Sequence, residues 1–364
     1  MENNIYAVII GTGSYIPTKK VPNDAFLKNE FYDIDGKKID LPNEEIIKKF
    51  EEITEIHERR YVKDNQSASD IAYLAAKDAL ESSGIDKESL DYIIVAHNFG
   101  DIRLENRQID IVPSLASRVK EKLGIKNPGT VSYDIPFGCP GWLQGLIQAN
   151  YYLKSGDAKR ALVIGAETLS KVSDPHDRDS MIYADGAGAT ILEGINSEEP
   201  VGILSHVTRT DTVDQAYNLW LGKSNNPKYA GNDLFLKMNG RKLYEYALRT
   251  VPQVVIESID KAGIMLNNVK KILIHQANAK MDYAIVKRIF NLYKEIKVPK
   301  LIMPMTISKL GNSSVATVPI LLNLLLNGRI KNHKLLPGQI AVLTSVGAGM
   351  NINSVIYKVP EFFI

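Results

Sequence analysis

Short apolar runs alternate with segments of helical periodicity along the whole chain. The clearest runs are YIIVAH (92–97), RALVIGAE (160–167), KILIHQ (271–276) and IAVLTSVG (340–347). Runs of this length, rich in Val, Ile and Leu, predict strands that are buried on both faces. The alternation therefore predicts an α/β protein with helices covering its sheets. No Gly/Ser-rich linker and no low-complexity segment divides the chain.

An internal repeat indicates that this pattern of helices and strands occurs twice along the chain. The segment 82–96 resembles 261–275, and Gly84 matches Gly263 at an offset of 179 residues. In each copy a predicted helix ends at Gly and a buried strand follows. The segments 137–156 and 310–328 form a second pair, and the runs at 160 and 340 form a third, in the same order. We expect a duplicated fold with an N-terminal half over 1–195 and a C-terminal half over 196–364.

Cys139 follows a predicted strand and precedes a predicted helix, in YDIPFGCPGWLQGLIQANYYLKSG (133–156). Gly138 permits a sharp turn and Pro140 fits a first helical turn. A sulfur at a helix N-terminus faces free N–H groups and the positive end of the dipole, so we expect a lowered thiol pKa and a reactive thiolate. The same N–H groups can bind an oxyanion. A lone cysteine is more often an inert core residue, but the Gly-Cys-Pro-Gly turn favours a nucleophile.

The repeat also singles out His275 and Asn312. His275 closes an apolar strand and precedes a predicted helix, and strand ends of α/β sheets are where ligands bind. Its rival among the six histidines is His97, and either one is compatible with a purely structural role. Asn312 occupies the position equivalent to Cys139, where an Asn is most simply a helix N-cap. Pseudo-twofold folding of the halves predicts that Cys139, His275 and Asn312 converge.

Two Gly-Ala-Gly segments complete the pattern. TSVGAGMNI (344–352) allows the backbone to approach a ligand, so it is a candidate for a second oxyanion N–H, with a plain turn as the alternative. Its first-half counterpart, DGAGATILE (185–193), is interpreted as structural.

Composition narrows the class of protein. The chain has 364 residues with 45% hydrophobic and 24% charged residues, which is ordinary for a soluble globular protein. The net charge of +2 and the lack of a long basic block argue against nucleic-acid binding. One cysteine excludes disulfides within the chain and suits a reducing cytoplasm. The N-terminus is interpreted as a first strand, and no apolar stretch of about 18 residues predicts a membrane span.

Several motifs, in order, resemble one family. They are GTGSYIPTKKVPN (11–23), ERRYV (58–62), Gly-Cys-x-Gly (138–141), SDPHDRDSMIYADGAGA (173–189), LKMNGRKLY (236–244), HQAN (275–278) and GNSS (311–314). The chain resembles ketoacyl-acyl-carrier-protein synthase III among the thiolase-fold condensing enzymes. Each motif alone is weak, but together they are specific. The resemblance implies a thiolase-like fold, with two duplicated α/β halves in a layered αβαβα core.

The resemblance also implies a reaction, a decarboxylating Claisen condensation. Cys139 would take an acyl group from a thioester, and His275 and Asn312 would stabilise the enolate of a malonyl thioester on acyl-carrier protein. Backbone N–H groups of Cys139 and Ala348 would form the oxyanion hole. No metal and no resident cofactor are implied, because phosphopantetheine arrives with the substrate. The family's pantetheine tunnel maps onto Arg178, Met238, Gly240, Tyr244, Ala277 and Asn278.

The chain departs from the family at several positions. Lys49 and Ile53 stand where the family often has a Trp and an Arg that bind CoA, and Val112 stands where a Phe often limits the acyl pocket. Glu245 replaces a usual Lys of the carrier-protein docking patch. We expect that patch to include Arg241, Lys242, Arg249 and Lys280, with the first three on one helix over roughly 240–250. The resemblance also implies a homodimer.

Three other functions compete with condensation. A Cys-His-Asn acyltransferase or thioester hydrolase would form the acyl-enzyme without extending it, and release of CO₂ from a malonyl thioester separates the two. A non-catalytic partner subunit would not need Cys139. A redox sensor would need a resolving cysteine, and the chain has none.

Overall fold

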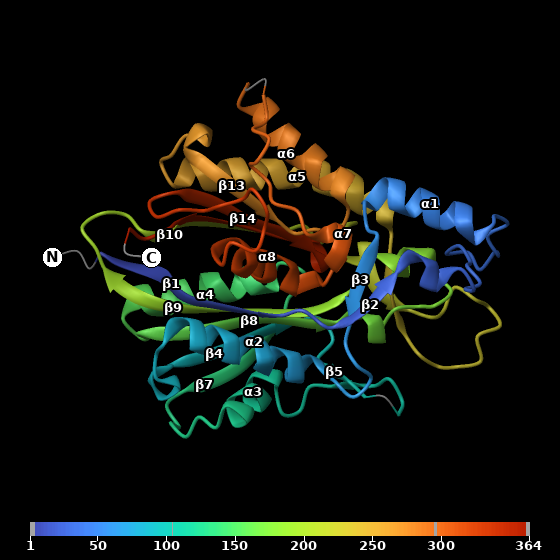
Figure 1. Ribbon diagram of the computed structural model, residues 1–364, viewed down its shortest axis with the longest axis horizontal. Helices are drawn as coiled ribbons and strands as arrows, with labels where there is room; N and C mark the ends of the chain where they lie inside the picture. The colour runs from blue at the N-terminus through green and yellow to red at the C-terminus, as the bar shows by residue number, and fades with distance from the viewer. Residues whose placement is uncertain (1–3, 104, 295–296, 362–364) are drawn as a thin grey trace.

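The computed structural model describes residues 4–103, 105–294 and 297–361. Its elements stack in five layers, which Figure 1 shows from edge to edge: helices, a sheet, helices, a second sheet and helices. The predicted αβαβα architecture is therefore confirmed. Cys139 follows a strand of the first sheet and His275 follows a strand of the second sheet. The stacking of the two sheets therefore determines how these residues lie relative to each other.

The first sheet has five strands in the order β1-β9-β8-β4-β7. Strands β4, β7 and β8 are parallel, whereas β9 runs antiparallel to β8 and β1. The predicted strand at 92–97 matches β4, and all but its first residue are buried. The bounds are β1 Ile5–Tyr15, β4 Tyr92–His97, β7 Val131–Pro136, β8 Arg160–Thr168 and β9 Asp185–Asn196.

The second sheet repeats this topology. Its order is β10-β15-β14-β13, with two antiparallel pairings followed by one parallel pairing, as in the β1-β9-β8-β4 part of the first sheet. The strands are β10 Gly202–Thr210, β13 Val269–Ile274, β14 Ile340–Gly347 and β15 Asn351–Lys358. β4 and β13 thus occupy equivalent places, as do β8 and β14, which explains the sequence repeat. We propose to divide the chain into halves 1–195 and 196–364, because β9 and β10 belong to different sheets.

Helices fill the three remaining layers. α4 (Gly141–Ser155) and α8 (Thr317–Leu326) lie between the sheets, and their apolar side chains join both sheets in one buried cluster. α2 (Ala68–Ser83) and α3 (Leu115–Leu123) cover the outer face of the first sheet. α5 (Gly240–Lys261) and α6 (Ala279–Leu292) cover the second. The helix expected to end near 250 continues to Lys261, because the apolar face of α5 is buried along this length.

Smaller elements gather at one end of the layers. They are β2 (Lys19–Pro22), β3 (Glu58–Tyr61), α1 (Asn43–Thr54), β5 (Asp101–Ile102), β6 (Ile109–Asp110), β11 (Leu219–Gly222), β12 (Phe235–Met238) and α7 (Ile307–Leu310). In the described part of the chain, no helix has the length and apolar character needed to cross a membrane. Within the same residues, no three His, Cys, Asp or Glu side chains are grouped to hold a metal ion.

Candidate active site

A cavity of about 940 Å³ opens where the two sheets and the smaller elements meet. Cys139, His275 and Asn312 all line it, so the structure brings together the three side chains that the repeat singled out. They come from the start of the α4 segment, the end of β13 and the turn before α8. Because α4 and α8 share the middle layer, the two equivalent helix starts face the same space.

Cys139 lies in a tight junction between two glycines. Gly138 has a φ of +72°, and a Cβ there would lie 3.1 Å from the backbone nitrogen of Ala348. A Cβ on Gly347 would lie 2.7 Å from the backbone nitrogen of Cys139, a clash with rigid backbone. Glycine at both positions lets the backbone segment around Cys139 approach the segment around Ala348 closely. Cys139 and Ala348 both line the cavity, so their backbone N–H groups remain candidates for one oxyanion hole.

The thiol does not show the lowered pKa that its helix position predicts. The pKa of Cys139 is raised to about 11, mainly by burial and in smaller part by the nearby Glu167 carboxylate. A hydrogen bond with the hydroxyl of Ser314 lowers it in part. Removing the thiol from water disfavours the charged form more than its donors favour it. The expectation of a resting thiolate was therefore wrong, and acylation requires removal of a proton.

His275 is buried and fixed by one partner. Its Nδ1 lies 2.6 Å from Oγ1 of Thr317, whose hydroxyl donates to the Ser314 carbonyl oxygen at 2.8 Å. The hydroxyl has a single proton, so the ring donates from Nδ1 and leaves Nε2 as an acceptor. Burial lowers the pKa of His275 to about 4, which keeps the ring neutral at physiological pH. His275 can therefore take up a proton only at Nε2.

Asn312 is fixed by hydrogen bonds of its backbone and of its side-chain carbonyl oxygen. Its backbone forms hydrogen bonds with the residues on both sides of Tyr183. Asn312 N donates to Ile182 O at 3.0 Å, and Ala184 N donates to Asn312 O at 2.8 Å. Its Oδ1 accepts from the Ser314 backbone N–H at 2.7 Å. The amide nitrogen is the remaining polar atom of a side chain that lines the cavity, so it is placed to donate to a ligand.

Sequence reasoning missed Asn98, Glu167 and Ser314. Ser314 contacts the sulfur, Asn98 contacts Ser314, and Glu167 contacts Asn98. A carboxylate at the end of the apolar run RALVIGAE was a usable signal for Glu167, because buried acids need a specific partner. Ser314 stood inside the GNSS motif, but nothing in the sequence distinguished it from Ser313.

The residues mapped to the pantetheine tunnel all lie on the cavity wall. They are Arg178, Met238, Gly240, Tyr244, Ala277 and Asn278. Lys49 and Ile53 of α1 line the cavity as well, so the positions where the chain departs from the family face the same space. The cavity wall is mainly apolar apart from the side chains around Cys139 and a few charged residues near α1 and α5.

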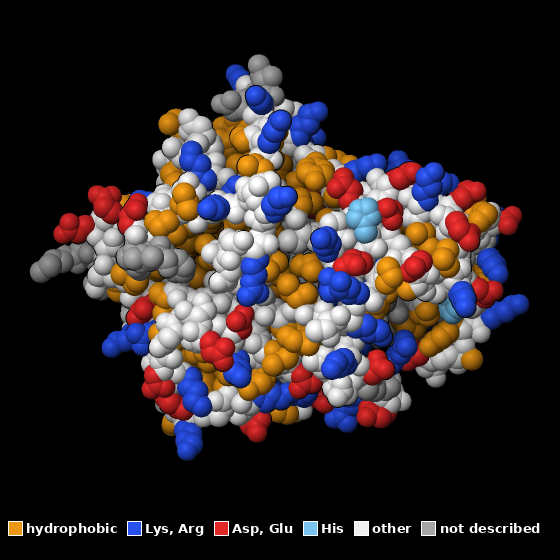
Figure 2. All heavy atoms as spheres, viewed as in Figure 1, with side chains coloured by type: hydrophobic (Ala, Val, Ile, Leu, Met, Phe, Trp, Pro, Cys, Tyr) orange, Lys and Arg blue, Asp and Glu red, His pale blue; other side chains and the backbone are white. Residues whose placement is uncertain are grey.

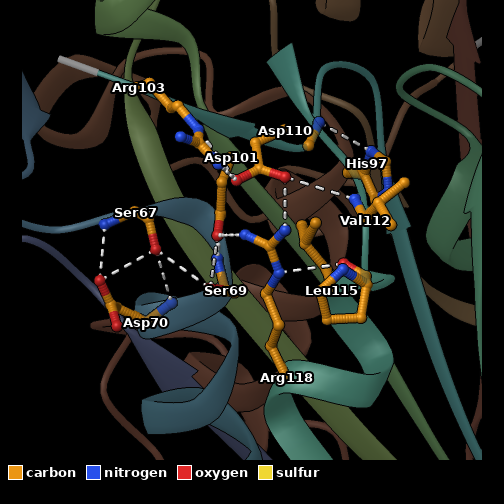
Figure 3. A network of polar contacts seen from close by, with 12 residues as sticks. Ser67, Ser69, Asp70, His97, Asp101, Arg103, Asp110, Val112, Leu115 and Arg118 are labelled. Carbon is orange, nitrogen blue, oxygen red and sulfur yellow. Dashed lines mark hydrogen bonds and ion pairs between the residues drawn. The ribbon is translucent and has the colours of Figure 1, made fainter. Parts of the chain in front are cut away.

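Val112 does not line this cavity, so the expectation that it limits an acyl pocket is wrong for a single chain. Its side chain is 82% exposed, in the loop that follows the β5–β6 hairpin. Arg118 holds the hairpin by pairing with Asp101 and Asp110 at 2.7 Å each, as Figure 3 shows. These ion pairs tie the hairpin to α3.

His97, the rival of His275, is structural. It is buried beside Asp134, with Nε2 at 3.1 Å from the carboxylate, and its Nδ1 accepts from the Gly100 backbone N–H. Both ring nitrogens are occupied by these contacts. His97 is not part of the cavity wall, so among the described residues His275 is the histidine that lines the cavity together with Cys139.

The residues expected to dock a carrier protein are all exposed. Arg241 and Lys242 begin α5, Arg249 follows two turns later, and Lys280 lies in the first turn of α6. Arg241 forms an exposed ion pair with Glu245 at 3.0 Å. On α6, Lys280, Lys287 and Arg288 are exposed whereas Asp282 is buried. Figure 2 accordingly shows blue Lys and Arg side chains outnumbering red ones over α6.

Comparisons with known proteins point to one family. A family model described as 3-oxoacyl-[acyl-carrier-protein (ACP)] synthase III matches residues 133–212, and the model of its C-terminal part matches 259–359. The beta-ketoacyl-[acyl-carrier-protein] synthase III of Xanthomonas euvesicatoria pv. vesicatoria is 32% identical over 364 residues, covering 98% of this chain and 100% of the relative.

Solved structures give the same result. The 3-oxoacyl-[acyl-carrier-protein] synthase III of Aquifex aeolicus has a TM-score of 0.74 and 30% identity, over 97% of this chain and 99% of that chain. The corresponding enzyme of Pseudomonas aeruginosa has a TM-score of 0.79 and 26% identity, over 98% of each chain.

Proposed function

This chain belongs to the 3-oxoacyl-[acyl-carrier-protein] synthase III family, and from that premise we propose that it catalyses a decarboxylating Claisen condensation. An acyl group on Cys139 joins a malonyl unit carried by acyl-carrier protein, which gives a 3-oxoacyl product. The observation that carries the proposal is the meeting of Cys139, His275 and Asn312 in one cavity. The product serves fatty acid initiation or a specialised lipid or polyketide pathway.

The first step loads the nucleophile. Nε2 of His275 takes the proton as the sulfur of Cys139 attacks the carbonyl carbon of an acyl thioester. The negative charge on the carbonyl oxygen is stabilised by the N–H groups of Cys139 and Ala348, which the glycine junction brings together. Collapse of the intermediate breaks the C–S bond of the donor, and the departing thiolate takes the proton from His275.

The second step makes the carbon nucleophile. His275 and Asn312 donate hydrogen bonds to the thioester carbonyl of the malonyl unit, so the enolate left by CO₂ is stabilised. Donation from Nε2 requires the other ring tautomer. The Thr317 hydroxyl permits it by turning from the Ser314 carbonyl to donate to Nδ1. The enolate then attacks the acyl carbon, and the sulfur of Cys139 leaves as a thiolate that takes a proton from solvent water.

The substrates arrive as thioesters of a long arm, so no resident cofactor is needed. The cavity wall formed by Met238, Tyr244 and Ala277 suits the pantetheine arm, and the volume of about 940 Å³ accommodates both the arm and an acyl chain. Arg178 offers a cation to a phosphate at the entrance. Because Lys49 and Ile53 replace an adenine-binding pair, a carrier-protein thioester is a candidate acyl donor beside CoA.

Acyl-carrier protein is the proposed partner, and the exposed cations of α5 and α6 are its proposed docking patch. Carrier proteins are acidic, and α6 presents Lys280, Lys287 and Arg288 beside the cavity-lining Asn278. We also propose a homodimer. The exposed apolar side chains of Ile111 and Val112, 52% and 82% exposed, are compatible with a partner that covers them. A monomer at micromolar concentration in light scattering would contradict the dimer.

The experiment that tests the proposed nucleophile is intact-mass analysis after exposure to acyl-CoA and acyl-carrier-protein thioesters. We expect one acyl adduct on the chain and none on Cys139→Ser, which is nearly isosteric. The reactive member of the panel identifies the primer and the donor. An equal adduct on Cys139→Ser would reject Cys139 as the acylated residue. A loaded enzyme that hydrolyses the acyl group without consuming malonyl thioester would favour the alternative, a Cys-His-Asn acyltransferase or hydrolase.

A further inference from the structure

A chain of polar contacts runs from the sulfur of Cys139 to a buried carboxylate. The Oγ of Ser314 lies 3.2 Å from the sulfur, and the Nδ2 of Asn98 lies 2.9 Å from that Oγ. Asn98 also contacts Oε2 of Glu167 with its side-chain nitrogen, and its backbone N–H donates to the same oxygen at 2.8 Å. These residues come from β8, the segment after β4 and the turn before α8, and the reaction proposed above gives no role to them.

The direction of each hydrogen bond follows from the chemistry of the groups. Above its raised pKa of about 7 the Glu167 carboxylate only accepts hydrogen bonds, so in that pH range the atom of Asn98 that faces it is the amide nitrogen. The same nitrogen donates to Oγ of Ser314. The single proton of that hydroxyl is then directed to a different acceptor, and the sulfur of Cys139 is at hydrogen-bond distance. We infer that Ser314 donates a hydrogen bond to the nucleophile, and that Asn98, anchored by Glu167, holds the hydroxyl in this orientation.

The backbone of Ser314 supports the inference independently. Its φ is +52°, in the left-handed region that side chains other than glycine rarely occupy. Asn312 holds it there, with Oδ1 accepting the Ser314 N–H at 2.7 Å. A serine occupies this strained position although glycine would fit it without strain, and strain of this kind clusters at functional sites. The strain also ties the sulfur contact to Asn312, since one turn positions both.

The surroundings of the sulfur explain why the donor matters. The titratable groups near it are Glu167, Tyr183 and His275. Tyr183 and His275 are neutral because burial disfavours their charged forms, and Glu167 repels a developing thiolate. Ser314 and the N–H of Cys139 oppose this repulsion. Asn98 donates hydrogen bonds to the Glu167 carboxylate and, at the same time, to the hydroxyl of Ser314.

The test uses the single cysteine of the chain, which gives one resonance after labelling with [¹³Cβ]cysteine. The inference rests on Cys139 as the proposed nucleophile, but the readout is ionisation of the free thiol, so it fails or succeeds apart from condensation. The carbon shift is followed from pH 7.5 to 10.5 in the full-length protein. We expect Ser314→Ala to hold about 10-fold less thiolate at a given pH, because hydrogen bonds to charged groups are the strong ones.

Three variants complete the design. Ser314→Gly removes the hydroxyl and relieves the left-handed strain, so it should match Ser314→Ala and carry the test if the alanine variant folds poorly. Ser313→Ala removes a buried neighbouring hydroxyl that does not contact the sulfur, and it should titrate like the parent. Asn98→Ala should shift the curve in the same direction by less.

The double variant Asn98→Ala/Ser314→Ala separates a direct effect of Asn98 from one through Ser314. If Asn98 acts through the hydroxyl, the double variant should titrate like Ser314→Ala alone. An unchanged curve for both Ser314 variants would overturn the inference, as would an equal shift for Ser313→Ala. An additive double variant would overturn the positioning role of Asn98.

Discussion

Nδ1 of His275 lies 2.6 Å from Oγ1 of Thr317, and this contact determines which nitrogen of the ring faces the cavity as an acceptor. The Thr317 hydroxyl also reaches the Ser314 carbonyl oxygen at 2.8 Å. In one orientation the hydroxyl accepts from Nδ1 and leaves Nε2 free to take a proton. In the other it donates to Nδ1, and Nε2 then carries a proton. The proposed reaction needs both states, in succession.

Thr317→Val should therefore lower the rate of condensation while leaving the protein folded. Valine keeps the shape of threonine but removes the hydroxyl, so the ring loses its partner and neither tautomer is selected. We expect a loss of about 10²-fold in condensation, comparable to the loss of one oxyanion donor. Thr317→Ser, which keeps the hydroxyl, should retain most of the activity. Equal rates for Thr317→Val and the parent would remove Thr317 from the mechanism.

Loading and decarboxylation should separate in variants of the two donors. Asn312→Ala should still acquire an acyl group on Cys139, because its amide acts on the malonyl unit. His275→Ala should load more slowly but still load, since the thiol can lose its proton to solvent base at raised pH. Both should lose about 10²–10³-fold in release of CO₂ from malonyl-carrier protein. Normal CO₂ release from either variant would reject its role as an enolate donor.

Glu167 gives a dependence of stability on pH. Burial raises the pKa of its carboxyl from 4.5 to about 7. Between these values the unfolded chain is ionised while the folded chain holds the proton. Raising the pH from 4.5 to 7 therefore favours unfolding, by at most roughly 3 kcal/mol. Glu167→Gln removes this contribution but keeps an acceptor for Asn98.

The free energy of unfolding in urea, measured from pH 4.5 to 8, checks this expectation. Asp185, whose pKa burial raises to about 6, is present in parent and variant, so the difference between them reports Glu167 together with its repulsion from Asp185. The variant should gain stability over the parent as the pH rises to 7 and hold that gain above it. A difference that does not change with pH would show that Glu167 titrates as it does in the unfolded chain.

The docking patch predicts an effect on one substrate only. Charge reversal at Arg249 and Lys280 should raise the apparent KM for malonyl-carrier protein, and added salt should weaken association of the parent in the same way. Acylation by a small thioester should stay nearly unchanged. Lys331→Glu, an exposed lysine outside the cavity wall, is the control. An equal effect on both reactions, or on neither, would contradict the docking assignment.

The fold and the three residues Cys139, His275 and Asn312 could be predicted from the sequence because local sequence patterns indicate both. A buried strand must be apolar along its length, so β4 and β14 were visible as runs, and duplication made their equivalence visible as a repeat. The position of Cys139 followed from the glycine and proline around it, since these residues restrict the backbone. Asn312 followed from its equivalence to Cys139.

The electrostatics of the site could not be predicted in the same way. The pKa of Cys139 depends on burial and on Glu167, which is distant in the sequence, and these outweigh the favourable helix start. The role of Thr317 depends on a hydrogen bond across 42 residues. Val112 was misplaced because the clamp of Arg118 on the hairpin is a tertiary contact. Such contacts leave no periodic trace in a single sequence.

The most direct test of the central claim follows CO₂ and product in one reaction. Enzyme acylated on Cys139 is mixed with malonyl-carrier protein, and released CO₂, 3-oxoacyl-carrier protein and the mass of the enzyme are measured together. Condensation predicts one CO₂ and one 3-oxoacyl product for each acyl group lost from Cys139, and no 3-oxoacyl product from Cys139→Ser. Loss of the acyl group as free acid, with malonyl-carrier protein left intact, would contradict the account.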